Sequence, residues 1–483
     1  MLEALLRHNY LPAQKKDKEE LPPILSSLRF SPNAARELAK ASKRKGSDGW
    51  DSVEYRATRF NGVPRPLAIP HPLAYALLCL CIYENWSKLE YIANNKTSLV
   101  RPRRYPDGRI IIMDYEKSRE KSRRAAELAF GKRFLVHTDI ANCFPSIYSH
   151  AVPWAAVGFQ YAKKNKKNIG EWFNQLDEKL RWTKRNETQG VAIGPATSNV
   201  VTEAILAKID ETLDSEGFAF LRYIDDYKAY CETEEKAQDF IRRLAEELSR
   251  YKLLLNIKKT EVCALPEASS PDWVSRLALS APKSKVNVYD ALNYLDFAVS
   301  LAEEEPDGSV LKYALKALLS RGVDPITASD LLPHALALSF HQPALIPLLN
   351  SLIRKTLSRG PIACGSELHE LAMENAKLHR SDGLCWSLYY LNKFRVAISG
   401  SLADEVINCK DCLGLLLLYL SGEPCHQSLV VQFAQQLDGT DTYELDQYWL
   451  LLYQLFLDSR INNPYTGEDA FPVLKAEGVT FVT

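Results

Sequence analysis

Residues 221–227 read Leu-Arg-Tyr-Ile-Asp-Asp-Tyr, and this stretch governs the interpretation of the whole chain. Apolar, β-branched and aromatic residues flank two adjacent acids, which predicts a strand, a tight turn and a second strand. The tip of that hairpin presents Asp225 and Asp226 together. Two like charges held this close repel each other unless a cation lies between them. The stretch therefore indicates a divalent-metal site or, as the alternative, a solvated Asp pair in a surface turn.

The composition is that of a globular protein, but the charge is unevenly placed. The chain has 483 residues, 46% hydrophobic and 25% charged, which allows two or three domains. Residues 1–200 hold 34 Lys and Arg against 20 Asp and Glu, whereas residues 201–483 hold 26 against 40. A basic first part suits a phosphate-rich partner, which the acidic second part would repel. Arg101, Arg103 and Arg104 lie in a Pro-containing loop, where nucleic-acid contact and a solvated surface are equally good explanations.

The cysteines and apolar runs favour a cytoplasmic protein without a membrane partner. The ten cysteines form no regular framework, which indicates free thiols in a reducing compartment. The first ten residues are amphipathic and lead into a charge cluster, so we expect no secretory signal. The apolar runs at residues 73–82 and 413–420 are far too short to span a bilayer.

A third acid closes an apolar segment upstream. The segment Phe134–Ile140 has the pattern of a buried strand and carries Asp139 near its end. A carboxylate in such a position is costly unless it is paired or bound to a metal. Asp139 is therefore a natural partner for Asp225 and Asp226.

The order of these elements predicts a polymerase palm. A strand ending at Asp139, a Gly-rich turn leading into a helix from Ala196, and the Asp-Asp hairpin follow one another. Such a palm holds two metal ions about 4 Å apart, which activate a hydroxyl and stabilise the leaving pyrophosphate. All-oxygen ligands suit Mg²⁺, and Mn²⁺ is an alternative. Asp139 and Asp225 would bridge the ions, and Asp226 would help to hold the second one.

Five stretches in this order resemble reverse transcriptase motifs. They are Arg65–Pro70 (fingers motif), Asp139–Phe144 (motif A), Gln189–Pro195 with Ser198 and Asn199 (motif B), Tyr223–Asp226 (motif C) and Leu255–Thr260 (motif D). The resemblance implies that Arg65 binds the triphosphate and that Gln189 and Gly190 line the nucleotide pocket. It implies that Phe144 excludes a ribose 2′-hydroxyl, so that dNTPs are the substrates. Lys259 would donate a proton to the pyrophosphate, giving Asp139, Asp225, Asp226 and Lys259 as the catalytic set.

Two departures from these motifs narrow the resemblance. Gly194-Pro195 replaces the usual Ser-Pro, and no apolar-Leu-Gly primer-gripping hairpin follows motif D. The chain is similar to the Abi group of bacterial abortive-infection reverse transcriptases, the AbiK-like and prophage-borne polymerases. His150–Trp154 and the aromatic run Tyr448–Tyr453 fit that group. The resemblance implies untemplated, protein-primed synthesis, single-stranded DNA covalently attached to the protein, a homo-oligomer (trimer or hexamer) and a role in anti-phage defence.

The expected architecture is α+β, with fingers and palm but no conventional thumb, followed by an all-α, HEAT-like helical repeat. We expect an N-terminal arm over residues 1–30, the reverse-transcriptase-like domain over 31–275 and the helical repeat over 286–483. We predict the helical repeat because apolar residues recur there at helical spacing, interrupted by Gly and Pro. Tyr10 lies in this flexible-looking arm and is the only Tyr before Tyr55, so it is our candidate for the priming hydroxyl. The alternative is that Tyr10 packs the arm onto the domain, as the sequence Tyr-Leu-Pro commonly does.

Two alternatives to a self-primed polymerase stay open. One is a template-using reverse transcriptase that copies a partner RNA. The other is a degenerate polymerase that serves as a binding module, against which the three intact acids argue. Template-free synthesis with dNTPs and Mg²⁺ would discriminate between them.

Overall fold

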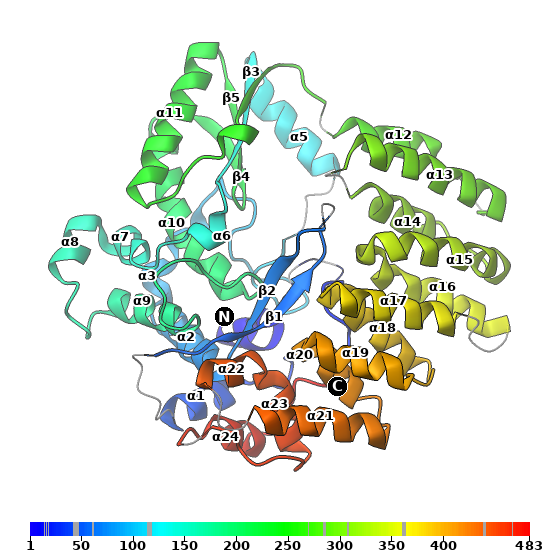
Figure 1. Cartoon of the computed structure of the whole chain (residues 1–483). Coiled ribbons are helices and arrows are strands. Elements are labelled where there is room, and N and C mark those ends of the chain that lie inside the picture. The colour runs from blue at the N-terminus through cyan, green and yellow to red at the C-terminus, as the bar shows by residue number, and fades with distance from the viewer. Residues whose placement is uncertain are drawn as a thin grey trace.

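The computed structural model describes residues 1–13, 15, 17, 19–41, 48–59, 62–113, 118–268, 270–283, 286–306, 309–359, 364–437, 441–465 and 467–483. Figure 1 shows a palm with its sheet and helices at the upper left. A curved array of helices follows the right-hand side and the bottom, and a two-stranded hairpin lies between them. No helix of the described ranges combines the length and apolarity that crossing a bilayer requires.

The palm is built on a four-stranded antiparallel sheet in the order β4-β5-β3-β6. Its strands are β3 (Phe134–Asp139), β4 (Ala219–Tyr223), β5 (Asp226–Cys231) and β6 (Glu261–Ala264). The amphipathic helix α11 (Glu234–Arg250) packs against β5, β3 and the largely buried helix α10 (Ala196–Ser215). These helices cover one face of the sheet, which leaves the other face for the site.

The fingers consist of a hairpin and several helices that join the palm. Strands β1 (Ser52–Ala57) and β2 (Arg65–Pro70) pair antiparallel, with Ser52 opposite Pro70. The helices are α1 (Pro32–Ala41), α2 (Pro72–Glu84), α3 (Trp86–Leu89), α4 (Tyr91–Asn94), α5 (Ser118–Ala129), α6 (Cys143–Ser146), α7 (Ala151–Val157), α8 (Phe159–Lys164) and α9 (Trp172–Trp182). The buried helix α2 packs against α1 and α9 and so forms the centre of this part.

The first 30 residues are part of the core, which corrects the expectation of an arm laid over a domain. A short π-helix, η1 (Ala4–His8), buries Leu5 and Leu6 completely. Farther along, Ser26 N donates to Phe481 O at 2.9 Å, so this segment also binds the end of the helical array. The apolar residues of the segment are therefore core residues that join distant parts of the chain.

The second half of the chain is helical. Its α-helices are α12 (Asp272–Ser280), α13 (Val288–Glu304), α14 (Val310–Ser320), α15 (Pro325–His341), α16 (Leu349–Thr356), α17 (Gly365–Lys377), α18 (Ser381–Lys393), α19 (Gly400–Cys409), α20 (Cys412–Tyr419), α21 (Pro424–Gln436), α22 (Thr442–Gln447), α23 (Trp449–Leu457) and α24 (Ala470–Ala476). Successive helices pack in pairs, as α13 does with α14 and α17 with α18. Because α12 packs against α13 and α14, the array begins before residue 286; its HEAT-like character stays a prediction.

The array is fastened to the fingers by hydrogen bonds at and beside the β1–β2 hairpin. Trp449 Nε1 donates to Ile69 O at 3.1 Å, inside the protein. Asp51 N donates to Asp446 Oδ2 at 2.9 Å, and Thr58 N donates to Asp382 Oδ2 at 2.8 Å. Buried polar groups that find partners across this boundary hold the β1–β2 hairpin in one position. The hairpin thus stands between the array and the palm (Figure 1).

Candidate active site

The hairpin predicted at residues 221–227 is present, and its turn carries the two acids. Tyr223 of β4 is paired with Asp226 of β5, so Ile224 and Asp225 form a two-residue turn. Ile224 has φ of +59°, as primed hairpin turns require, although a β-branched residue rarely adopts it. Asp225 therefore lies in the turn and Asp226 begins the next strand.

Asp139 lies beside this turn because of the strand register. It is the last residue of β3 and is paired directly with Asp226 of β5. Directly opposed residues of antiparallel strands place their side chains on the same face of the sheet. In addition, Ile140 N donates to Asp225 O at 3.2 Å, which ties the turn to the end of β3. The structure thus brings together the three acids that the sequence predicted.

The electrostatics of this cluster fit a bound cation. Burial and the charge of Asp226 raise the pKa of Asp225 from its ordinary value of 3.8 to about 6. Burial and the charge of Asp139 also raise the pKa of Asp226. Asp139 Oδ1 is buried without a hydrogen-bond partner among the described residues. Asp139, Asp225 and Asp226 are therefore the residues that would hold divalent ions, which supply charge stabilisation and an activated hydroxyl when bound.

Lys259 reaches the same cluster from motif D. It ends a 3₁₀ turn, Ile257–Lys259, that follows the hydrogen bond from Asn256 N to Asp139 O at 2.9 Å. Its Nζ donates to Asp139 Oδ2 at 2.6 Å, and this bond raises the pKa of Lys259. The side chain is 67% exposed, so its ammonium group can also face a ligand in the cleft. Its role as a proton donor stays a prediction.

Arg65 approaches the acids from the fingers hairpin. It is the first residue of β2, and burial lowers the pKa of its guanidinium, while the negative charge of Asp225 acts in the opposite direction. Its Nε is buried without a hydrogen-bond partner among the described residues. The Arg65 guanidinium thus has a buried nitrogen without a partner and interacts electrostatically with Asp225, so it is suited to bind an anionic ligand beside the acids.

The predicted nucleotide-pocket residues lie on two segments that are bonded to each other. Phe144 is 6% exposed in α6, and its carbonyl accepts a bond from Val191 N at 3.0 Å. Gln189 Nε2 donates to Pro145 O at 3.3 Å. Gly190 has φ of +83°, and a Cβ there would lie 3.1 Å from Pro145 O, so a larger residue would separate the segments. Motif B is thus bonded directly to motif A.

Residues 92–297 match the family model described as reverse transcriptase (RNA-dependent DNA polymerase). The chain carries a reverse-transcriptase domain. Such a domain indicates a nucleotidyltransferase of the RNA-directed DNA polymerase type, a class that uses divalent metal ions and nucleotide substrates. The matched range includes every candidate site residue except Tyr10 and Arg65.

Among solved structures, telomerases of two Candida species show low similarity to this chain. Apo telomerase from Candida tropicalis is 11% identical, covering 74% of this chain and 73% of that chain, with a TM-score of 0.33. Telomerase from Candida albicans in complex with the TWJ fragment of telomeric RNA is 9% identical, covering 82% and 68%, with a TM-score of 0.31. A comparison with curated proteins gives no significant match.

Tyr10 is far from accessible, and the expectation of a flexible priming arm is wrong for this residue. Its side chain is completely buried, and its hydroxyl donates to Pro70 O. Its ring packs against Tyr75 and Trp449, with centroids 4.3 Å and 6.3 Å away, and burial raises the pKa of its hydroxyl. The sequence Tyr-Leu-Pro marks a packed segment here, because the aromatic ring completes a core shared with the helical array.

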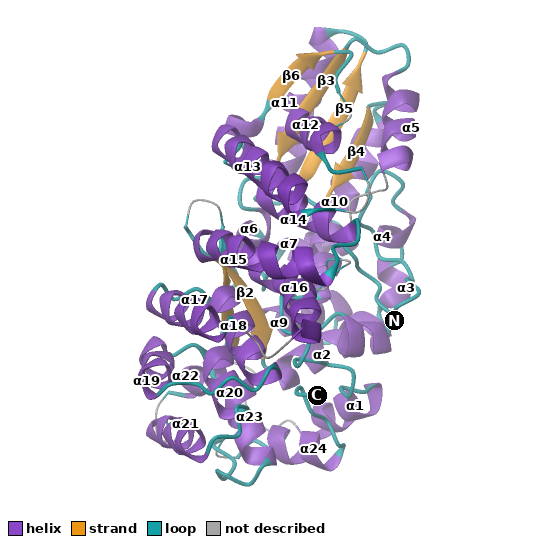
Figure 2. Ribbon diagram, turned by 90° about the vertical axis from the view of Figure 1, so that its right-hand side faces the viewer, coloured by secondary structure: helices purple, strands orange, loops and turns teal. Residues whose placement is uncertain are grey.

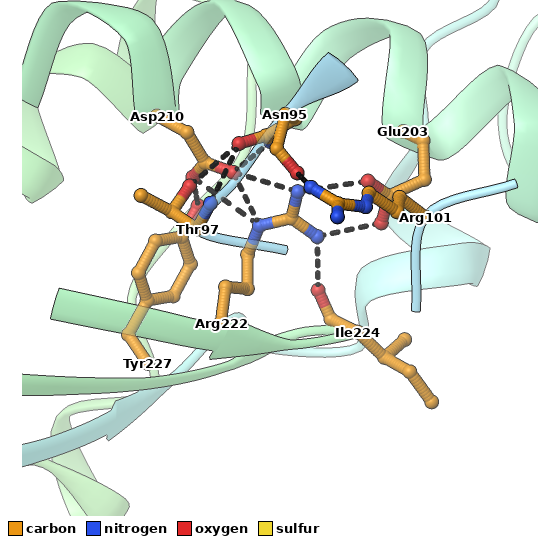
Figure 3. A network of polar contacts seen from close by, with 8 residues as sticks. All are labelled: Asn95, Thr97, Arg101, Glu203, Asp210, Arg222, Ile224 and Tyr227. Atoms are coloured by element: carbon orange, nitrogen blue, oxygen red, sulfur yellow. Dashed lines mark hydrogen bonds and ion pairs between the residues drawn. The ribbon is translucent and has the colours of Figure 1, made fainter. Parts of the chain in front are cut away.

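Arg222, which the sequence motifs did not single out, fixes the hairpin of the reverse-transcriptase domain onto α10. Figure 3 shows its completely buried guanidinium between Glu203 and Asp210, both of α10. The ion-pair distances are 2.7 Å from Nη1 to Glu203 Oε1 and 2.7 Å from Nη2 to Asp210 Oδ2. Nη1 also donates to Ile224 O at 2.8 Å, in the turn itself. The sequence did contain a signal for this role: Arg222 is a charged residue within an apolar strand pattern, and a buried charge needs a buried partner.

A cavity of about 1110 Å³ covers the open face of the palm sheet. Asp139, Asp226 and Lys259 lie on its wall, together with α5 and the segment at residues 265–268. Its basic side chains are Lys121, Arg124, Lys132, Lys228, Lys258 and Lys259, against the acids Asp139, Asp226, Glu261 and Glu267. Asp139 and Asp226 therefore face a large cleft with a surplus of positive charge, which suits a polyanionic ligand.

Proposed function

We propose that this protein is a reverse-transcriptase-type DNA polymerase that extends a hydroxyl with dNTPs, using Mg²⁺ or Mn²⁺ held by Asp139, Asp225 and Asp226. The observation that carries the proposal is the register of Asp139 opposite Asp226, with Asp225 in the adjoining turn. In this proposal, Lys259 and Arg65 face the phosphates. Phe144, Gln189 and Gly190 line the sugar and base side of the pocket.

We further propose synthesis without a template, on a hydroxyl of the protein itself, in abortive-infection defence of a bacterial cytoplasm. The segment after motif D supports this mode. In the described residues 261–268, β6 is followed by Leu265–Ala268, which lines the cleft, and then α12 begins at Asp272. Leu265 N donates to Arg133 O at 2.8 Å, so this segment is bonded along the sheet where a primer-gripping hairpin would stand.

The priming hydroxyl must be exposed, which Tyr10 is not. Tyr289 of α13 is 73% exposed, more than any other tyrosine of the described residues, so it is the first to test. In the assembly expected from the Abi resemblance, a trimer or hexamer, a second copy of the chain could equally present its hydroxyl. Mapping the DNA-linked residue by mass spectrometry decides among these sources.

The second candidate function is RNA-templated synthesis on a partner RNA, which the basic walls of the cleft favour. The deciding experiment incubates the purified full chain with labelled dNTPs and Mg²⁺, with or without RNA, and separates the products on a denaturing gel. Label that stays on the protein without RNA supports self-primed synthesis, whereas product only with RNA supports the second function. The Asp226→Asn variant is the inactive reference that shows the background of the assay. Absence of product above this background under every condition contradicts both functions.

A further inference from the structure

A second, smaller pocket lies on the fingers, apart from the catalytic cleft. Its volume is about 330 Å³, at the lower end of the range of ligand pockets. It is lined by Met1, Tyr83, Trp86, Pro102, Arg103, Arg104 and Ile110. Two aromatic rings and the side chains of two arginines thus meet at one hollow with an almost entirely apolar wall, and no acid is among the lining residues.

The arginine side of this pocket is a rigid loop. Arg103 N donates to Ile110 O at 2.9 Å, and Tyr105 N donates to Arg109 O at 3.0 Å, which closes a small hairpin. The Arg109 guanidinium is buried and donates a hydrogen bond to Asp107, which anchors the loop to the interior of the protein. A loop braced in this way fixes the backbone from which the exposed side chains of Arg103 and Arg104 project.

The two arginines keep their charge available. Arg103 lies over the ring of Tyr105 at 4.9 Å and donates from Nε to the Tyr105 hydroxyl at 2.8 Å, a partner that does not neutralise it. Arg104 is exposed and forms no ion pair within the described parts of the chain. Of the ambiguous Arg101–Arg104 cluster, Arg101 is bonded to Asn95 O, whereas Arg103 and Arg104 flank the pocket.

The aromatic side of the pocket is open to solvent. Tyr83, near the end of α2, is 44% exposed, and Trp86 begins α3 at the same corner. An exposed aromatic ring next to guanidinium groups is the arrangement that binds single-stranded nucleic acid, because a base stacks on the ring while its phosphates pair with the cations. A duplex does not offer its base faces in this way.

The position of the pocket connects it to the palm. Leu99 N donates to Arg222 O at 2.9 Å, so the segment leaves the edge of β4 next to the Asp-Asp hairpin. Four residues farther, at most about 14 Å of extended chain, it reaches Arg103. In Figure 2, α3, α4 and the N-terminus occupy the right-hand edge, opposite α17, α19 and α21. A strand leaving or entering the cleft on that side would meet the pocket.

We infer that this pocket, Tyr83 and Trp86 with Arg103 and Arg104, binds a base and the adjoining phosphates of single-stranded nucleic acid. The inference rests on the proposed polymerase function only for the source of the strand, which would be DNA product or RNA template. The shared chemistry is an unpaired base between two phosphates. Binding is measurable in the absence of metal and dNTPs, and therefore independently of synthesis.

The test measures fluorescence anisotropy of the full chain with two probes, fluorescein-labelled dT12 and U12, in EDTA. Tyr83→Ala is expected to weaken binding about fivefold or more, since stacking contributes that much per base. Arg103→Gln with Arg104→Gln is expected to lower the salt dependence, by about 0.7 in the log–log slope for each lost phosphate contact. Tyr83→Phe, which keeps the ring, is expected to retain native affinity.

The matched control is Arg354→Gln with Lys377→Gln, which removes two exposed charges from α16 and α17 and should change neither affinity nor slope. Tighter binding of U12 points to a template and tighter binding of dT12 to the product; either supports the site. Pocket variants that bind both probes like the control would overturn it, as would absence of binding to either probe by the native chain. Unchanged binding by an Asp139→Asn variant that makes no DNA separates this test from that of the proposed function.

Discussion

Arg222 and Asp210 form an ion pair in the interior of the palm, with 2.7 Å between Arg222 Nη2 and Asp210 Oδ2 and almost no exposure of either side chain. Arg222 stands three residues before Asp225, and its guanidinium also holds the carbonyl of Ile224. The ion pair thus connects the helix α10 to the turn that carries the acids. The position of the candidate metal site therefore depends on the buried charge of Arg222, although within the described residues Arg222 forms no hydrogen bond or ion pair with the side chains of the three acids.

Replacing Arg222 by Met should destabilise the protein and abolish DNA synthesis. The change leaves Glu203 and Asp210 buried without their cation, which typically costs about 3–5 kcal/mol in the free energy of unfolding. Urea denaturation measures this cost. Arg242→Gln is the control, because its ion pair with Asp239 is exposed and should contribute little to stability. Equal effects of the two substitutions would contradict the proposed bracing role.

Asp139→Asn and Asp226→Asn should each lower nucleotide incorporation by about 10³-fold or more, because each removes a charge that would hold the metal ions. The melting temperature without metal should stay the same or rise, since repulsion within the acid cluster decreases. Incorporation assays and thermal unfolding check the two expectations. Retained activity in both variants would contradict the assignment of the site.

Stabilisation by Mg²⁺ should be greater at pH 8 than at pH 5. The raised pKa of Asp225, about 6 against 3.8 ordinarily, means that the folded protein holds this proton more tightly than the unfolded chain does. The metal-free protein therefore loses stability as the pH rises from about 4 to about 6, and a cation bound to the ionised acids offsets this loss. Melting temperatures with and without MgCl₂ at both pH values measure the effect, which Asp225→Asn should reduce.

Tyr10→Phe should lower stability without preventing attachment of DNA to the protein. The change leaves the carbonyl of Pro70 without its buried donor, which costs about 1–3 kcal/mol. Thermal unfolding and a denaturing gel give the two readouts. Tyr161→Phe, at a ring that is 50% exposed, is the control and should change neither. Loss of attachment with unchanged stability would restore Tyr10 as the primer.

Phe144→Val should increase the use of ribonucleotides relative to deoxynucleotides by about tenfold, because a smaller side chain leaves room for the 2′-hydroxyl. The ring is 6% exposed in α6, so some loss of stability is also expected. Parallel incorporation of dNTPs and rNTPs gives the ratio, which does not depend on the fraction of folded protein. An unchanged ratio would contradict the role of Phe144 as a gate for the sugar.

Local pattern was sufficient for the elements that bear the acids. Apolar, β-branched and aromatic residues on both sides of Asp225-Asp226 predicted the β4–β5 hairpin, and the apolar run before Asp139 predicted β3, because strand formation there follows from residues close in sequence. The motif order then indicated a reverse-transcriptase-like palm, and residues 92–297 match that family model. By itself, the sequence determined the type of domain and which three acids to consider.

Only the tertiary structure decided how distant residues meet. Tyr10 was predicted to be exposed, since nothing next to it in sequence shows that Trp449 and Phe481 enclose it. The bracing by Arg222 and the pocket shared by Tyr83 and Arg104 likewise depend on contacts between separate elements. Burial and ion pairing are set by neighbours in space, whereas pattern and propensity report neighbours along the chain. The register that pairs Asp139 with Asp226 is likewise set by neighbours in space, and it brings three acids from separate parts of the sequence into one candidate site.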